Sequence, residues 1–153
     1  MPYKLTWEDR GVVAQYWGVI TYEVLFQSNE EQKLGPRDDH NEYALGVFSN
    51  SVVFDVSGPE LRRIAAMDAA ASQTKPNFVV AIVAEQAVIH GLANMYRLQH
   101  EAVGGQWNTN FFHDRRGSET TDCRGPGLRA RKIEERMDRA HVTPFLEADH
   151  VFL

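Results

Sequence analysis

The sequence predicts an α/β domain, with helices packed mainly on one face of a mixed β-sheet of four to five strands. Strand-like and helix-like stretches alternate in the order strand, strand, helix, strand, helix, strand, helix, strand. The stretch Phe78–Ala84 is continuously apolar and rich in β-branched residues, as expected of a central strand that is covered on both faces. The chain length of 153 residues suits one domain with a core of its own.

The first two elements are predicted to form an antiparallel hairpin. Residues Tyr3–Trp7 alternate between apolar or aromatic and polar side chains, which is typical of a half-buried strand. Residues Val12–Trp17 are rich in β-branched and aromatic residues and are followed by Gly18. The short polar link between the two strands includes Gly11, which is free to adopt a positive φ in the turn.

The first helix is predicted to begin after Thr21, whose hydroxyl can cap it, and to end at about Lys33. A polar loop follows, and Tyr43–Phe48 is the third predicted strand. The periodic face of the helix is weak and consists of Val24, Leu25, Ser28 and Gln32.

The second helix follows a short apolar stretch, Val52–Phe54, and fades near Gln73. We expect its core face to consist of Leu61, Ile64, Ala65 and Asp68 or Ala69. The third helix is predicted at Gln86–Ala102, and Trp107–Phe112 is the last strand. The expected inner face of the third helix consists of Val88, Ile89, Leu92, Met95 and Tyr96.

We place the domain at residues 1–114 and treat residues 115–153 as an atypical C-terminal extension. Asp114–Gly127 lacks large apolar residues and reads as a linker, and Leu128–Ala140 predicts one helix with few apolar residues. Such a helix docks weakly or not at all, so we expect the domain to fold without it. The tail is either a genuine extension or the product of a shifted reading frame.

Charge and cysteine content narrow the class of protein. The net charge is −5, with 13 acidic against 8 basic residues in 1–113 and 8 against 8 in 114–153. An acidic body repels a phosphate backbone, which argues against nucleic acid as a partner. The single cysteine, Cys123, excludes an internal disulfide, and the N-terminus has no secretory signal. We therefore expect a cytoplasmic protein without a transmembrane segment; its oligomeric state stays open, and a dimer is possible.

Ser57 is the residue with the most informative surroundings. Ser57, Gly58, Pro59 and Glu60 form a capping-box pattern, in which the serine oxygen accepts from the N–H of the third residue and Glu60 reaches back. The hydroxyl would also be a candidate phosphorylation site, because a helix N-terminus favours negative charge. The role of Ser57 as a helix cap explains the local sequence fully. Phosphorylation of Ser57 as a regulatory switch is a second interpretation that the sequence leaves open.

The neighbouring charged residues allow similar pairs of interpretation. Asp55 either accepts backbone N–H groups in the turn or helps to recognise a kinase or a divalent ion. Arg62 and Arg63, near the helix start, either hold a phosphate or carboxylate or simply solvate the helix. None of the six histidines has zinc-site spacing, and no nucleophile motif or phosphate loop is present. We therefore expect no catalytic residue, no metal and no cofactor.

The run Val53-Phe54-Asp55-Val56-Ser57-Gly58 resembles the STAS domains, the family of bacterial anti-anti-sigma factors. That family places an Asp-x-Ser-Gly at a strand-to-helix junction, and its serine is the phosphorylated switch. The wider pattern is closer still to the STAS/SEC14-like (sporulation anti-anti-sigma-factor-like) bacterial proteins. It is carried by three stretches: 54–57 with 62–65, Val80–Ala84 and Gly91–Tyr96. The likeness spans about residues 3–114, and Pro59-Glu60 and the tail depart from it.

The resemblance implies a non-enzymatic regulatory module that binds a protein partner at the strand-to-helix junction. The residues that would meet the partner are Asp55, Ser57, Gly58, Arg62 and Arg63. The alternative is a protein that binds a small molecule, lipid-like or nucleotide-like, in the space between the helices and the sheet. An enzyme would be a third class, and no constellation of residues supports it.

Overall fold

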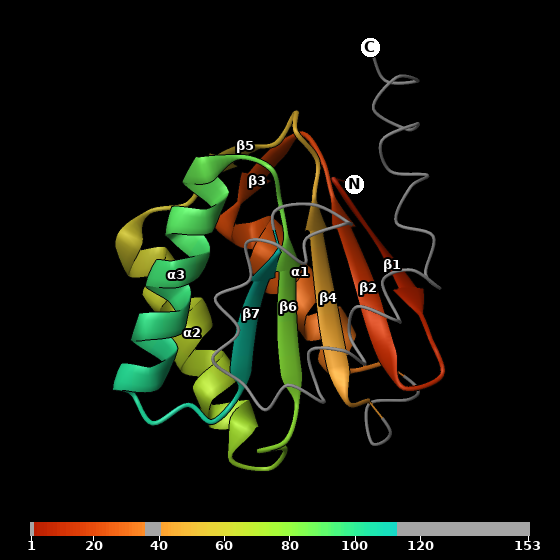
Figure 1. Cartoon of the computed structure of the whole chain (residues 1–153), viewed down its shortest axis with the longest axis vertical. Coiled ribbons are helices and arrows are strands. Elements are labelled where there is room, and N and C mark those ends of the chain that lie inside the picture. The colour runs from red at the N-terminus through yellow and green to blue at the C-terminus, as the bar shows by residue number, and fades with distance from the viewer. Residues whose placement is uncertain (1, 36–40, 113–153) are drawn as a thin grey trace.

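Five strands form one mixed sheet at the centre of the molecule (Figure 1). The computed structural model describes residues 2–35 and 41–112. β1 is antiparallel to β2, and every other neighbouring pair in this sheet is parallel. The mixed sheet of four to five strands is therefore confirmed. In their order across the sheet, the strands are β1 (Tyr3–Trp7), β2 (Gly11–Tyr16), β4 (Tyr43–Phe48), β6 (Val79–Val83) and β7 (Asn108–Phe112).

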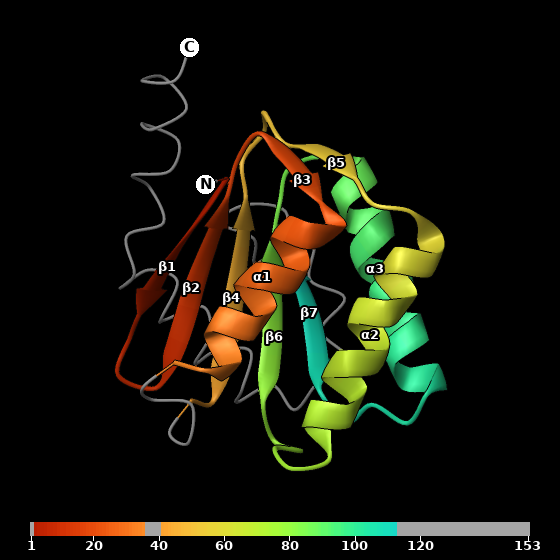
Figure 2. The ribbon, with the colours of Figure 1, turned by 180° about the vertical axis from the view of Figure 1, so that it is seen from behind.

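Three helices connect the parallel strands and lie on the same face of the sheet (Figures 1 and 2). They are α1 (Tyr22–Lys33), α2 (Gly58–Ser72) and α3 (Ala87–Ala102). Each crossover leads to the next strand along the sheet, from β2 to β4, β6 and β7. Because crossovers of this kind share one hand, strands added in one direction place their helices on one face. The expected packing of helices on one face is confirmed.

A second, small sheet joins β3 (Val19–Thr21) to β5 (Val53–Asp55) in parallel. It lies at the end of the molecule to which β4 points, and β5 leads directly to the start of α2 (Figure 1). The sequence marked Val52–Phe54 only as an apolar stretch and gave no sign of β3, because three residues are too few to show a period.

The core face of α2 agrees with the prediction, whereas that of α3 differs from it. Leu61, Ile64, Ala65, Asp68 and Ala69 of α2 are all buried. Val88 and Met95 of α3, which we expected inside, are 58% and 41% exposed. The buried stripe of α3 runs through Ile89, Ala93, Tyr96 and His100. The buried stripe is therefore rotated around the helix relative to the predicted one. The prediction did not count the small Ala93 and the polar His100 as core residues.

Gly11 corrects another expectation. Among the described glycines only Gly18 and Gly104 have a positive φ, at 68° and 84°. A Cβ atom at Gly11 would lie only 2.3 Å from Cζ of Tyr43, its pairing partner on β4. Glycine is therefore required at this position by the close approach of an aromatic ring, and not by the turn.

None of the helices within residues 2–35 and 41–112 is both long and apolar enough to span a lipid bilayer. The linker and helix that we expected in residues 115–153, together with Cys123, lie outside the described residues. So does the end of the domain that we placed at residue 114.

Candidate functional site

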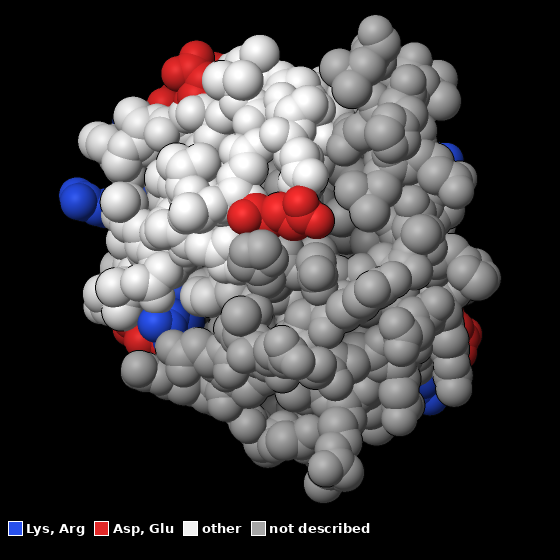
Figure 3. Space-filling view, turned by 45° about the horizontal axis from the view of Figure 1, so that its top comes forward, with Lys and Arg blue, Asp and Glu red and all other residues white. Residues whose placement is uncertain are grey.

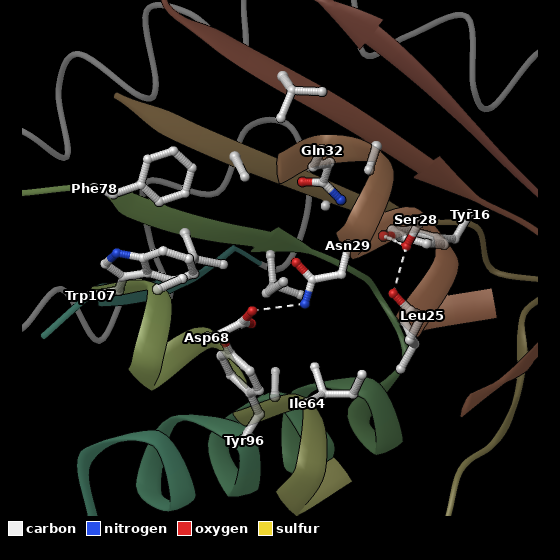
Figure 4. A pocket seen from close by; sticks show the side chains of 18 of the residues that line it. Tyr16, Leu25, Ser28, Asn29, Gln32, Ile64, Asp68, Phe78, Tyr96 and Trp107 are labelled. Carbon is white, nitrogen blue, oxygen red and sulfur yellow. Dashed lines mark hydrogen bonds between the residues drawn. The ribbon is translucent and has the colours of Figure 1, made fainter. Parts of the chain in front are cut away.

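A pocket of about 210 Å³ lies between the three helices and the side of the sheet that faces them (Figure 4). Small residues at the centre of the sheet, Ala44 and Gly46 on β4, leave this space open. Phe78 and Trp107 border one end, and Tyr16 borders the other. The remaining apolar wall is formed by Val12, Ala14, Leu25, Phe48, Phe54, Leu61, Ile64, Ala71, Val80, Ile82, Ile89, Leu92 and Ala93.

The pocket wall includes one buried carboxylate, Asp68 of α2, which is 6% exposed. Asn29 of α1 donates from Nδ2 to its Oδ1 over 2.7 Å, and the Tyr96 hydroxyl of α3 donates to its Oδ2 over 2.6 Å. The Nζ of Lys33 lies 3.7 Å from Oδ1. Asp68 thus links all three helices, and its two oxygens accept from groups that are already in place before a ligand enters.

Burial raises the pKa of the Asp68 carboxyl. The hydrogen bonds from Tyr96 and Asn29, and the charge of Lys33, act in the opposite direction but are smaller effects. The Tyr96 hydroxyl has a pKa well above its ordinary value, because it is buried and faces the same carboxylate. A polar cluster in which burial raises the pKa of two groups, inside a mainly apolar pocket, is typical of a functional site.

Asn41 adds a polar atom that has no partner. Its side chain lines the pocket and is 8% exposed, and its Oδ1 is buried without a hydrogen bond. A buried acceptor left in this state costs about 1–3 kcal/mol. A ligand that carries a hydrogen-bond donor would remove this cost.

The opposite end of the pocket is closed by a polar pair that is satisfied within the protein. Ser28 Oγ donates to the Leu25 carbonyl over 3.0 Å, so the Tyr16 hydroxyl, 2.9 Å away, donates to Ser28. Burial raises the pKa of Tyr16 to about 12, which keeps this hydroxyl protonated at neutral pH. This end of the pocket therefore offers a ligand an aromatic ring rather than a charge.

Ser57 caps α2 as the sequence predicted. Its Oγ accepts from the Glu60 N–H over 3.2 Å, and the Ser57 N–H donates to Glu60 Oε1 over 2.9 Å. The backbone hydrogen bond from Ser57 is the main cause of a lowered pKa at Glu60. The capping-box interpretation is confirmed, and the hydroxyl lies at an exposed position on the surface.

The other predicted site residues lie near this cap and outside the pocket. Asp55 is the last residue of β5, and Gly58, Arg62 and Arg63 belong to the first half of α2. All five predicted residues are exposed, and none of them lines the pocket. The structure therefore separates two candidate sites, the surface junction at Ser57 and the internal pocket.

Histidine and acidic residues do not gather into a metal site in the described part of the chain, where no group of three or more His, Cys, Asp or Glu is placed to hold an ion. His100 has a structural role instead. Its buried ring accepts from the Trp107 N–H at Nε2 over 3.2 Å, so Nδ1 carries the proton and donates to the Ala65 carbonyl over 3.3 Å. This residue joins α2, α3 and the start of β7.

Sequence reasoning missed the polar residues of the pocket. Asp68 gave one usable signal, because it is a charged residue on the apolar face of a predicted helix. Asn29 and Tyr96 gave none, since they meet Asp68 across 39 and 28 positions of the chain. Asn41 follows a polar loop and resembles the residues around it.

Comparison with known proteins identifies no relative of this chain. No family model matches the sequence, and no curated protein or solved structure does so either. The pocket and the junction are therefore the observations on which a function can be based.

Proposed function

We propose that the protein is a non-enzymatic binding protein whose pocket holds a compact, mainly apolar molecule with a hydrogen-bond donor such as a hydroxyl group. One observation carries this proposal: a mainly apolar pocket is lined by Asn41, whose buried Oδ1 has no partner. Ligand sites in proteins typically combine apolar walls with a few polar groups that fix orientation.

The size and the mainly apolar lining of the pocket favour a molecule no larger than one ring or a short chain. Its volume of about 210 Å³ exceeds the roughly 150 Å³ of a cavity that admits benzene and is below the roughly 300 Å³ at which drug-sized sites begin. The wall includes the carboxyl of Asp68 together with Lys33 and Lys75, but most of the lining residues are apolar. These properties favour the lipid-like class of ligand over the nucleotide-like class.

Native mass spectrometry of the purified protein would detect a copurified molecule, and calorimetry with p-cresol would test the pocket directly. p-Cresol has one apolar ring and one hydroxyl donor. We expect it to bind the wild-type protein and to lose binding in Ala44→Leu, because the larger side chain fills the pocket floor. Ala66→Leu makes the same change on the exposed side of α2 and should leave binding unchanged.

The variant Asn41→Leu tests the role of the unpartnered oxygen. One hydrogen bond contributes about 1 kcal/mol, so p-cresol should bind up to about tenfold more weakly. Toluene, which lacks the hydroxyl, should bind this variant at least as well as the wild type. An equal loss for both compounds would show that Asn41 shapes the pocket without recognising a donor.

We propose a second function for the junction at Ser57, the docking of a regulatory protein partner. Val19 and Val53 are directly paired on β3 and β5 and are 52% and 60% exposed, and β5 leads toward Ser57. The described surface at this end of the molecule is mostly uncharged, with separate acidic and basic groups (Figure 3). An apolar pair on the small sheet that also carries exposed Asp55, with exposed Arg62 and Arg63 on the helix that follows, suits a protein partner, with phosphorylation of Ser57 as the switch.

Ser57→Asp and Ser57→Ala distinguish a cap from a switch. Asp caps a helix about as well as Ser, whereas Ala costs about 1 kcal/mol, so thermal melts should rank Ser57→Asp close to wild type and Ser57→Ala below it. If the junction binds a regulated partner, Ser57→Asp should also weaken capture of that partner, because it places negative charge beside Asp55. Equal capture by all three proteins, with no phosphate on Ser57 in the native protein, would leave only the cap.

A further inference from the structure

The helix α3 has an apolar face that points out of the molecule. Its core face runs through the buried stripe described above. The opposite side of the helix is formed by exposed residues that are all apolar or small: Val88, Gly91, Met95, Leu98 and Ala102. A surface helix normally carries charged and polar side chains on this side, so the outward row of α3 needs an explanation of its own.

The outward row of α3 follows the spacing of a seam between two helices. Its members recur at intervals of three, four, three and four residues, which is the a and d pattern of paired helices. Its three large members, Val88, Met95 and Leu98, are 58%, 41% and 53% exposed. The exposed side of α2, in contrast, includes Arg62 and Arg63. α3 therefore has one apolar row for its own core and a second row that fits another helix.

Charged side chains lie beside the outward row and not within it. The guanidinium of Arg97 turns toward β7, where its Cζ lies 5.7 Å from the centre of the Phe111 ring, and Nη2 donates to Asn94 Oδ1 over 2.6 Å. Glu101 flanks the row at its C-terminal end. α3 also lies at the outer side of the helical layer, beyond α2 (Figures 1 and 2). This position leaves room for a second helix along the row.

We propose that the outward row of α3 is a dimer interface, in which α3 of a second copy of this chain packs antiparallel against it. The charge of the molecule supports this occupant. Each copy has a net charge of −5, so two copies repel each other over most of their surfaces. The outward row carries no charge, and two copies can therefore meet there without placing like charges in the seam.

The sizes of the side chains make the row complementary to itself. In an antiparallel pair each a residue lies level with a d residue of the other helix, so that Gly91 faces Met95 and Val88 faces Leu98 of the second copy. Gly91 forms a notch, because a Cβ atom at this position would have no atom of its own chain within 4 Å. The Met95 side chain of the second copy fills this notch. A parallel pair would instead place one notch against the other.

The ends of α3 also favour the antiparallel direction. Its N-terminus has no side-chain cap and no acidic residue in the first turn. Glu101 lies in the last turn, where the dipole of its own helix disfavours a negative charge. In an antiparallel pair, Glu101 lies beside the N-terminus of the second α3, where a negative charge is favourable. Glu85, which precedes the helix, already accepts from Asn50 Nδ2 over 2.7 Å.

The length of α3 sets the expected strength of the dimer. Its 16 residues span about 24 Å, and with a helix diameter of about 10 Å the contact strip is roughly 240 Å² per copy. A standard stable interface buries about 800 Å² per partner. We therefore expect a weak dimer that dissociates on dilution.

Sedimentation velocity of the full-length protein over a dilution series tests the interface. We expect the sedimentation coefficient of the wild type to rise with concentration, and Leu98→Lys to remain a monomer because it places a charge in the seam. Leu34→Lys is the matched control, since Leu34 is 81% exposed and lies just after α1. A wild type that stays monomeric throughout, or association that Leu98→Lys leaves unchanged, would overturn the proposal.

A size exchange tests the pairing of Gly91 with Met95. Gly91→Leu should weaken association because it fills the notch, and Met95→Ala should weaken it because it leaves a gap. The double variant Gly91→Leu/Met95→Ala pairs a large with a small side chain again and should recover association. Both positions are exposed, so thermal melts should show that all three variants are folded. A double variant that associates no better than the single variants would contradict this pairing.

Oxidative crosslinking tests the direction of the helices. In a Cys123→Ser background, chains with Gly91→Cys and chains with Met95→Cys should crosslink to each other in a mixture, because the antiparallel seam places these positions side by side. Crosslinks that form mainly within each population, from Cys to the same position of a second copy, would show a parallel pair and overturn the antiparallel arrangement. Leu34→Cys chains should give no crosslink above background.

Discussion

Asp68 is a charged residue at a position where most proteins place an apolar one, the core face of a helix. Its carboxylate is held by donors from α1 and α3, so the cost of burying it is offset by hydrogen bonds. The desolvation effect still dominates, since the pKa of this carboxyl is raised. The protein therefore holds a proton at Asp68 more tightly when folded than when unfolded.

The sign of this shift predicts how stability depends on pH. A carboxyl whose pKa is higher in the folded state contributes stability that is fully present below its unfolded pKa of about 3.9 and is lost as pH rises through the folded pKa. Asp68→Asn cannot ionise and lacks this dependence. We therefore expect the wild type to lose stability relative to Asp68→Asn as pH rises above about 4, measured by urea unfolding across a pH series.

Tyr96→Phe serves as the companion variant. The Tyr96 hydroxyl lowers the pKa of Asp68 by hydrogen bonding, so its removal should raise that pKa further and move the loss of stability to higher pH. A wild-type protein that instead gains stability relative to Asp68→Asn with rising pH would show that the charge of Lys33 outweighs burial.

Among the helices and strands, those with a continuous apolar run or with an apolar period that extends over several turns were predictable from the sequence. Phe78–Ala84 showed its place in the sheet through an unbroken apolar run, and α2 through the spacing of Leu61, Ile64 and Ala65. The pairing of β3 with β5 was not predictable, because each strand has three residues and its partner lies more than thirty positions away. The stripe of α3 was misplaced because a buried histidine, His100, resembles a surface residue in sequence.

The two candidate sites also differ in how far the sequence alone could predict them. The cap at Ser57 depends on residues within three positions of one another, so the sequence alone predicted both of its hydrogen bonds. The pocket depends on Asn29, Asp68 and Tyr96, which only the packing of three helices brings together. Local chemistry can be read from a sequence, whereas convergence from separate elements requires the fold.

Pairing between strands gives a prediction at the same scale. Gly11→Ala should destabilise the protein by about 1–3 kcal/mol, because the new methyl group would overlap the buried ring of Tyr43 on β4. Gly58→Ala is the matched control, since a Cβ at that position has no atom within 4 Å. Denaturant unfolding of both variants checks this, and equal stability of the two would mean that the Tyr43 ring moves aside at little cost.

At the scale of the whole molecule, stability should be graded across the sheet. β4 and β6 have a hydrogen-bonded neighbour on each side, whereas within the described strands β1 and β7 have one. We expect the amides of β4 and β6 to show the slowest hydrogen exchange and those of β1 the fastest among the strands, because edge strands open locally. Exchange followed by NMR tests this order, and equal protection of β1 and β4 would indicate that the sheet opens only as a unit.

The order of the strands also has a consequence for how the protein is made. Because β2, β4, β6 and β7 lie side by side in the order of synthesis, each strand can pair with one already released from the ribosome. The pocket is different, since its wall takes residues from Val12 to Trp107 and is complete only when almost the entire described chain has emerged. A molecule that binds there cannot assist the early steps of assembly. It would stabilise only chains whose sheet is already complete, and it would leave incompletely folded chains unaffected.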